Sequence, residues 1–171
     1  MNSTEIEEAL RSERLCRDEF VGVFSADNIP HKEYPGAYIV NTDPSGQPGQ
    51  HWVAFYCTEP GQLEAFDSFG QSPGDYSPTI KDWMSDDFII VSSSILQSDD
   101  STLCGNYCLY FILLRCHGFS YEDILSIFCS DSKLNDLYVC KFINKYFKLK
   151  TTVRDTTFIL ESLIKNGRKT S

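Results

Sequence analysis

Cys104 stands where a polar loop gives way to the most apolar segment of the chain. Residues 98–102 are loop and N-cap types, whereas residues 107–114 are apolar on nearly every side, which predicts a buried central helix beginning near Cys104. The aligned dipoles at the start of a helix favour a negative charge. Because the thiolate is the reactive form of a cysteine, Cys104 is a candidate nucleophile.

This thiol needs a base and an acidic residue that orients the base. The candidates for the base are few, because the chain has three histidines. His51 follows a Gly/Pro-rich loop and opens an apolar strand, which predicts a ring at the sheet rim near solvent. Asp67 lies sixteen residues on, in the second of two strand-like runs that a Pro-Gly turn joins as a hairpin. If the hairpin forms, Asp67 can hold one nitrogen of His51 while the other faces the thiol, the arrangement of a catalytic triad.

Gln97 precedes Cys104 by seven residues, in the loop that leads into the helix. Its side-chain amide and the backbone N–H of Cys104 could together stabilise an oxyanion. Taken singly, each candidate has an ordinary explanation: a small core residue for Cys104, a rim histidine for His51, a turn residue for Asp67 and a surface amide for Gln97. Their combination, in this order and at these predicted positions, favours nucleophilic catalysis.

The elements that must position these residues follow an order of helix, strands, then helices. This order predicts an α+β fold in which an antiparallel sheet packs against the central helix. We expect one domain over residues 1–171, of which about 16–150 form the core that best matches the family resemblance given below. The predicted helices cover residues 3–17, 121–128, 134–147 and 158–164 besides the central one, and the strand-like segments cover 20–24, 36–42, 51–57, 63–69 and 88–92.

Composition narrows the functional classes further. The formal net charge of −9 argues against generic binding of nucleic acid. No apolar run approaches the roughly 20 residues that span a bilayer, and the first residues lack the features of a signal peptide. The sequence therefore predicts a soluble, intracellular protein. The seven cysteines have neither metal-ligand spacing nor paired spacing, so we expect free thiols and no metal site.

Four motifs resemble the adenovirus endopeptidase (adenain) family, which belongs to the wider group of cysteine proteases that includes the SUMO-cleaving enzymes. The motifs are Val40-Asn-Thr42, His51-Trp-Val-Ala-Phe55, Glu64-Ala-Phe-Asp-Ser-Phe-Gly70, and Gln97 followed by Cys104-Gly-Asn-Tyr-Cys108. The resemblance implies a papain-like fold in permuted order. It also implies His51 as base, Asp67 as orienter, Gln97 in the oxyanion hole and Cys104 as nucleophile.

The resemblance further implies a cysteine endopeptidase that cleaves Gly-containing sites in viral structural precursors. It implies action in the nucleus or cytoplasm of a host cell, with packaging in the virion. Members of the family are stimulated by DNA and by a disulfide-linked peptide, but this chain is acidic and has no cysteine over residues 82–97. Trp52 is predicted either to shield the His51–Cys104 pair and contact substrate or to be sheet core.

Two other functions stay open at this point. The same residues could serve an isopeptidase acting on ubiquitin-like modifiers, whose diglycine ends need a narrow channel. The chain could also be a non-catalytic, thiol-rich binding module that holds zinc, although no Cys-x-x-Cys pair supports this.

Overall fold

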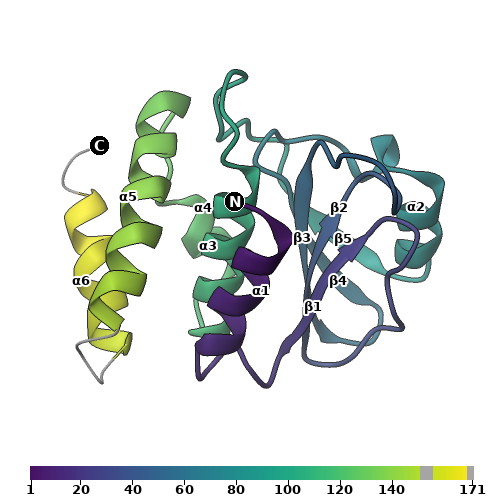
Figure 1. Cartoon of the computed structure of the whole chain (residues 1–171), viewed down its shortest axis with the longest axis horizontal. Helices are drawn as coiled ribbons and strands as arrows, with labels where there is room; N and C mark the ends of the chain where they lie inside the picture. Colours follow the sequence, from purple (N-terminus) through teal and green to yellow (C-terminus); the bar gives the residue numbers. More distant parts are fainter. Residues whose placement is uncertain (151–155, 169–171) are drawn as a thin grey trace.

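The computed structural model describes residues 1–150 and 156–168, which form a five-stranded sheet and six α-helices (Figure 1). The strands are β1 (Phe20–Ser25), β2 (Gly36–Asn41), β3 (Trp52–Glu59), β4 (Gln62–Phe66) and β5 (Phe88–Val91). The helices are α1 (Ser3–Ser12), α2 (Pro78–Met84), α3 (Cys104–Cys116), α4 (Tyr121–Leu125), α5 (Ser132–Lys150) and α6 (Thr156–Arg168), with a 3-10 turn, η1, at Pro73–Asp75. The α+β class and the predicted helices are confirmed.

The sheet is mixed, so the predicted antiparallel sheet is wrong at both edges. Its order is β1-β2-β3-β4-β5, and the central pairs β2–β3 and β3–β4 are antiparallel, whereas β1–β2 and β4–β5 are parallel. Parallel neighbours need a crossover connection. Residues 67–87, which include η1 and α2, supply this crossover between β4 and β5. The predicted hairpin is confirmed by the pairing of Ala54 with Phe66 and of Phe55 with Ala65.

Alternation along the strands divides the core into two halves, because successive strand residues face opposite sides of a sheet. Ala54 and Tyr56 of β3 face the half that contains α1 and α3. Val53, Phe55 and Cys57 face the half that contains α2. Helices cover both faces of the sheet, and Figure 1 shows α1 and α3 on one side and α2 on the other. The central strands are therefore apolar on both faces.

Helix α3 is the centre of the larger half of the core. Its first eleven residues, 104–114, are all buried, as its uniformly apolar composition predicts. The sheet covers one side of α3, and α5 and α6 form a layer on the other (Figure 1). This burial fixes the first residue of α3, Cys104, at the boundary between the helix layer and the sheet.

Helix α1 begins at Ser3, as the sequence predicts, but ends earlier than predicted. Asn2 caps it, because the Asn2 side chain accepts from the N–H of Glu5 while the Glu5 carboxylate accepts from the N–H of Asn2. The helix ends at Ser12, and Glu13 takes an extended backbone conformation. The hydroxyl of Tyr146 donates to the buried Glu13 carboxylate at 2.6 Å, which ties this end of α1 to α5.

Candidate active site

His51 and Asp67 meet at one end of the β3–β4 hairpin. Nε2 of His51 lies 3.0 Å from Oδ2 of Asp67. His51 directly precedes β3 and so lies at the sheet rim as predicted, but it is 7% exposed, so the prediction that its ring faces solvent is wrong. The Phe69 ring packs on the imidazole with ring centroids 5.1 Å apart, and this contact accounts for part of the burial.

Asp67 is held by two further donors. Its Oδ1 accepts from the backbone N–H of Phe69 at 2.8 Å, and its Oδ2 accepts from the hydroxyl of Tyr76 at 3.1 Å. Sequence reasoning missed Tyr76, which lies in the loop between β4 and α2 and has no local signal. Ser68 and Phe69 belong to the Glu64–Gly70 motif that carries the family resemblance, but the motif by itself predicts no contact for either side chain. These contacts fix the carboxylate that faces His51.

Cys104 is the first residue of α3 and is 8% exposed. Burial would raise the pKa of its thiol, but a hydrogen bond with His51, the backbone of Trp52, the charge of His51 and the backbone of Gly105 bring this pKa below its ordinary value. Burial would also lower the pKa of His51, but hydrogen bonds and negative charges from Asp67 and Cys104 raise it to about 9. The lowered pKa of the thiol and the raised pKa of the imidazole together favour a thiolate–imidazolium pair near neutral pH.

The His51 ring bridges the thiol and the carboxylate. Its Nε2 faces Asp67, which leaves Nδ1 for Cys104. Both ring nitrogens are buried, and within residues 1–150 and 156–168 neither has a hydrogen-bond partner of standard geometry, so Asp67 contacts Nε2 as an ion-pair partner. A histidine in this position can take a proton from the thiol and return it to a leaving group.

The lowered pKa of Cys104 gives a pH dependence that alkylation can measure. At about pH 6.5, well below the ordinary cysteine pKa of about 8.5, we expect iodoacetamide to modify Cys104 ahead of the other six thiols. Cys108, one turn further along α3, is the internal control, because burial raises its pKa well above the ordinary value. Mass mapping of the modified peptides would show the order, and equal labelling of both thiols would contradict the predicted ion pair.

Gln97 is fully buried in the loop before α3. Its Oε1 accepts from the Ser68 hydroxyl at 2.7 Å, and its Nε2 donates to the carbonyl of Ser101 at 3.0 Å and to its hydroxyl at 3.1 Å. The amide is therefore held between the residue after Asp67 and the loop that leads to Cys104. The surface-amide alternative for Gln97 is excluded by this burial, and its role as an oxyanion donor stays a prediction.

Trp52 opens strand β3 directly after His51 and is half-buried. Its side chain packs at the margin of the larger half of the core, as the sheet-core alternative predicts. Its backbone hydrogen-bonds the Cys104 thiol and lowers the pKa of that thiol. The strand that follows His51 therefore contacts the thiol through its first residue.

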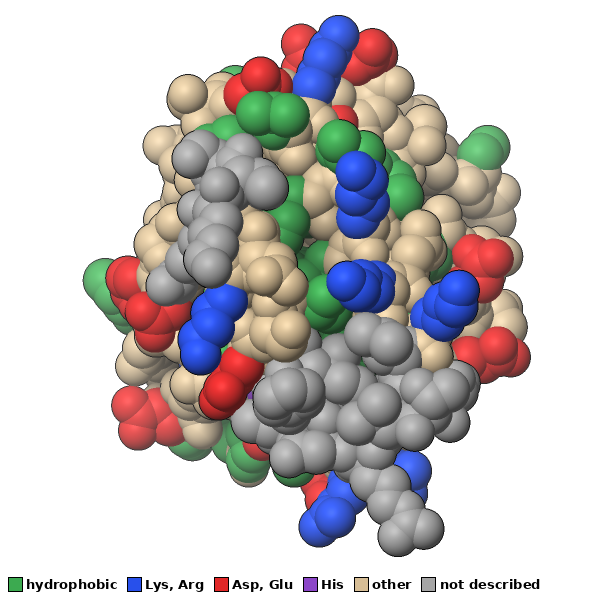
Figure 2. Space-filling model, turned by 90° about the vertical axis from the view of Figure 1, so that its left-hand side faces the viewer, with side chains coloured by type: hydrophobic (Ala, Val, Ile, Leu, Met, Phe, Trp, Pro, Cys, Tyr) green, Lys and Arg blue, Asp and Glu red, His purple; other side chains and the backbone are tan. Residues whose placement is uncertain are grey.

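A separate groove of about 350 Å³ lies between α5 and α6, away from these four residues. Leu134, Leu137, Tyr138 and Phe142 of α5 and Leu163 of α6 are among the residues that line it. Figure 2 shows this face of the molecule, where apolar side chains in a hollow lie beside lysine and arginine side chains. None of His51, Asp67, Gln97 and Cys104 lines the groove.

The seven cysteines all lie in the described part of the chain, and all are free thiols. Over residues 1–150 and 156–168, no three His, Cys, Asp or Glu side chains come together as a metal ion would require. No helix of this same part is both long and apolar enough to cross a bilayer.

An arrangement of thiol, imidazole and carboxylate at the start of a buried helix defines the geometry of a cysteine hydrolase. The chain is 29% identical over 125 residues to a cysteine protease of African swine fever virus, an alignment that covers 65% of this chain and 43% of the relative. It is 30% identical over 123 residues to a protein of Acanthamoeba polyphaga mimivirus named as a thiol protease, covering 67% of this chain and 41% of that protein.

A third relative, from a warthog isolate of African swine fever virus, is named as a SUMO-1 cysteine protease and is 30% identical over 125 residues. That alignment covers 65% of this chain and 43% of the relative. This chain thus aligns with less than half the length of each of these three proteins. No protein-family model matches the chain.

Proposed function

We propose that this chain is a cysteine endopeptidase in which Cys104 is the nucleophile and His51 the general base. The observation that carries the proposal is the buried His51 ring between Asp67 and the Cys104 thiol, with the pKa of the thiol lowered and that of the imidazole raised. The similarity to viral cysteine and thiol proteases supports the same chemistry.

In the proposed reaction, the Cys104 thiolate attacks the carbonyl carbon of a peptide bond and forms a tetrahedral oxyanion. The backbone N–H of Cys104 stabilises this oxyanion together with an Nε2–H of Gln97, which exchanges its hydrogen bond to Ser101 for one to the oxyanion. The His51 imidazolium then protonates the leaving amine, and the carbon–nitrogen bond breaks to leave a thioester. Water, deprotonated by His51, hydrolyses the thioester and releases the second product.

The proposed fold family is the papain-like one in permuted order. Two features support it: the base directly precedes β3 and the orienting acid directly follows the neighbouring β4, and the nucleophile opens the helix that packs on this sheet. In this chain the base and acid precede the nucleophile, which is the permuted order that the sequence resemblance implies.

The proposed substrates are polypeptides with Gly-containing cleavage sites in viral or virus-like structural precursors. This follows from the sequence resemblance and from the viral origin of the relatives. The proposed place of action is the host cell, in the nucleus or cytoplasm, or the virion. The proposed chemistry needs no metal or organic cofactor, and the net charge of −9 argues against activation by DNA.

A second candidate function is the cleavage of ubiquitin-like modifiers with the same residues. One observation favours it, namely that a relative from African swine fever virus is named as a SUMO-1 cysteine protease. The half-buried Trp52 beside the thiol could form one wall of a narrow channel for a diglycine end. The two candidates share their chemistry and differ in substrate.

A substrate panel separates the two candidates. Fluorogenic peptides with internal Gly residues and fluorogenic conjugates of ubiquitin-like modifiers would be incubated with the wild-type chain and with Cys104→Ala. Turnover of the peptides that is absent in the variant supports the endopeptidase, and turnover of the conjugates alone supports the second candidate. No Cys104-dependent turnover, together with stoichiometric zinc in the purified protein, would instead favour a thiol-rich binding module.

Asp67→Asn tests the orienting role of the carboxylate. The asparagine can still accept from the Phe69 N–H, but it lacks the negative charge that raises the pKa of His51. We expect kcat to fall on the order of 10²-fold and the alkaline limit of turnover, near the His51 pKa of about 9, to move to lower pH. An unchanged pH profile of kcat would remove Asp67 from the site.

A further inference from the structure

Gln97 lies at the centre of a short buried segment within an otherwise exposed loop. Residues 96–98 are buried, whereas residues 93–95 before them and 99–100 after them are exposed. On the sheet side, the backbone N–H groups of Leu96 and Gln97 both donate to the carbonyl of Ser68, at 2.9 and 3.0 Å. The loop has no helix or strand of its own here, so these contacts hold the amide in place.

On the opposite side, helices α3 and α5 hold the same segment through Asp136. One carboxylate oxygen of Asp136 accepts from the backbone N–H of Ser98 at 3.4 Å and from the Ser98 hydroxyl. The other accepts from the Tyr107 hydroxyl at 2.9 Å. The Tyr107 hydroxyl also lies 3.1 Å from the carbonyl of Leu96, so both neighbours of Gln97 are connected to this carboxylate.

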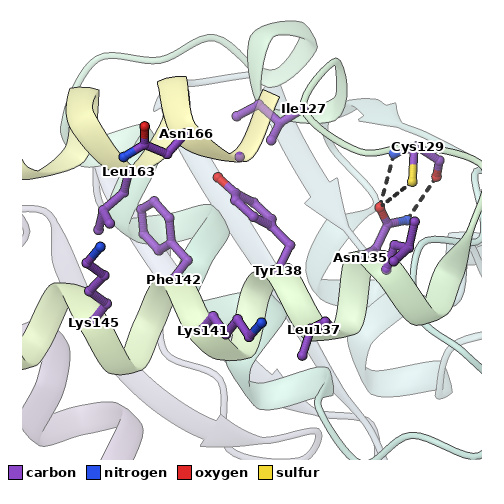
Figure 3. Close-up of a pocket in the computed structure, with 12 residues that line it drawn as sticks. Ile127, Cys129, Asn135, Leu137, Tyr138, Lys141, Phe142, Lys145, Leu163 and Asn166 are labelled. Carbon is purple, nitrogen blue, oxygen red and sulfur yellow. Dashed lines mark hydrogen bonds between the residues drawn. The ribbon is translucent and has the colours of Figure 1, made fainter. Parts of the chain in front are cut away.

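Asn135, the residue before Asp136, extends this attachment to the loop before α5. Its Nδ2 donates to the carbonyl of Leu96 at 3.1 Å and to the carbonyl of Cys129 at 2.9 Å. Figure 3 shows its side chain directed toward Cys129, at the end of the groove between α5 and α6. The first turn of α5 therefore contacts the Gln97 segment through two successive side chains.

We propose that Asp136 is a positioning residue that holds the Gln97 amide in place for the oxyanion. The inference rests on the proposed function, because it assigns Asp136 a role in the same reaction without contact to substrate. Asp136 is 9% exposed and faces three donors, and hydrogen bonds to an ionised acceptor are stronger than neutral ones. A buried carboxylate is costly unless it is hydrogen-bonded, and here the bonded groups belong to the Gln97 segment and to Tyr107.

Asp136→Asn tests the proposal. The NH₂ group of the asparagine would replace one carboxylate oxygen, so a group that can only donate would face at least one of the donors on Ser98 and Tyr107. We expect kcat/KM for a cleavable peptide to fall about 10- to 100-fold, less than the roughly 100-fold or more expected when an oxyanion donor is removed in Gln97→Ala. Alkylation of Cys104 by iodoacetamide forms no oxyanion, so its rate is expected to stay within about twofold of wild type. Tyr107→Phe keeps the ring and removes one donor to Asp136. It should likewise lower kcat/KM while leaving the rate of Cys104 alkylation near wild type.

The double variant Gln97→Ala with Asp136→Asn separates positioning from general destabilisation. If Asp136 acts through Gln97, adding Asp136→Asn to Gln97→Ala should lower kcat/KM no further. Asp131→Asn is the matched control, because Asp131 accepts from the first N–H groups of α5 and asparagine is an equally good N-cap. This control also removes one negative charge near the start of α5, but Asp131 does not contact the Gln97 segment, so the variant should keep wild-type kcat/KM.

Three results would overturn the inference. They are wild-type kcat/KM in both Asp136→Asn and Tyr107→Phe, multiplicative losses in the double variant, and a parallel loss of Cys104 alkylation. In each of these cases, peptide turnover by the wild-type chain keeps the proposed endopeptidase intact. A wild-type chain that hydrolyses none of the substrates would overturn the proposed function and, with it, the role of Asp136.

Discussion

Cys104→Ala is expected to abolish peptide hydrolysis while the fold stays intact. The thioester cannot form without the sulfur, so kcat should fall by on the order of 10³-fold or more. The side chain is small and lies at the first position of α3, so its loss leaves little empty volume. Initial rates of peptide cleavage would measure the effect, and circular dichroism and thermal unfolding would report the fold.

Cys140→Ala is the matched control for the loss of a thiol. Cys140 lies on α5 and is half-buried, and its sulfur accepts a hydrogen bond from Asn144. This variant should cleave peptide at the wild-type rate. Activity near wild type in Cys104→Ala would end the hypothesis that Cys104 is the nucleophile.

His51→Ala is expected to lower turnover nearly as much as Cys104→Ala, because the members of a catalytic triad act as a unit. It should also change the thiol itself. Without the imidazolium, burial dominates and raises the pKa of Cys104, so its alkylation moves to higher pH. Combining His51→Ala with Cys104→Ala should cause no further loss of kcat.

His31→Ala provides the control for the loss of a histidine. His31 is exposed, and its backbone carbonyl, which the substitution keeps, accepts from the Tyr38 hydroxyl. Both kcat and the pH midpoint of Cys104 alkylation should match wild type in this variant. If alkylation of Cys104 in His51→Ala keeps its wild-type midpoint, the proposed ion pair is wrong.

The raised pKa of His51 depends on the burial of the ring as much as on the charged groups beside it. In water, a carboxylate and a thiolate would affect the imidazole weakly, because solvent screens the charges. Here the His51 side chain is 9% exposed and that of Asp67 is fully buried, so the same charges raise the pKa of His51 to about 9. The proposed protease chemistry therefore requires the packing of Phe69 and the sheet around the ring.

The sequence by itself determined the elements, the hairpin and the position of Cys104. The continuous apolar run in residues 52–57 and the uniformly apolar residues 107–114 follow from burial on every side, and burial leaves a direct pattern in composition. The Pro-Gly turn sets a short connection between β3 and β4, so the approach of Asp67 to His51 could also be predicted.

The tertiary structure alone decided the parallel edges of the sheet, the burial of His51 and the partners of the polar residues. The residue pattern of a strand indicates which of its faces are buried. It does not indicate which strand pairs with it after a crossover connection, so the pairing of β5 with β4 could not be predicted from sequence. The contacts of Tyr76 with Asp67 and of Asp136 with Ser98 join residues that are 9 and 38 positions apart. Such polar pairs have no periodicity, and only packing brings their atoms together.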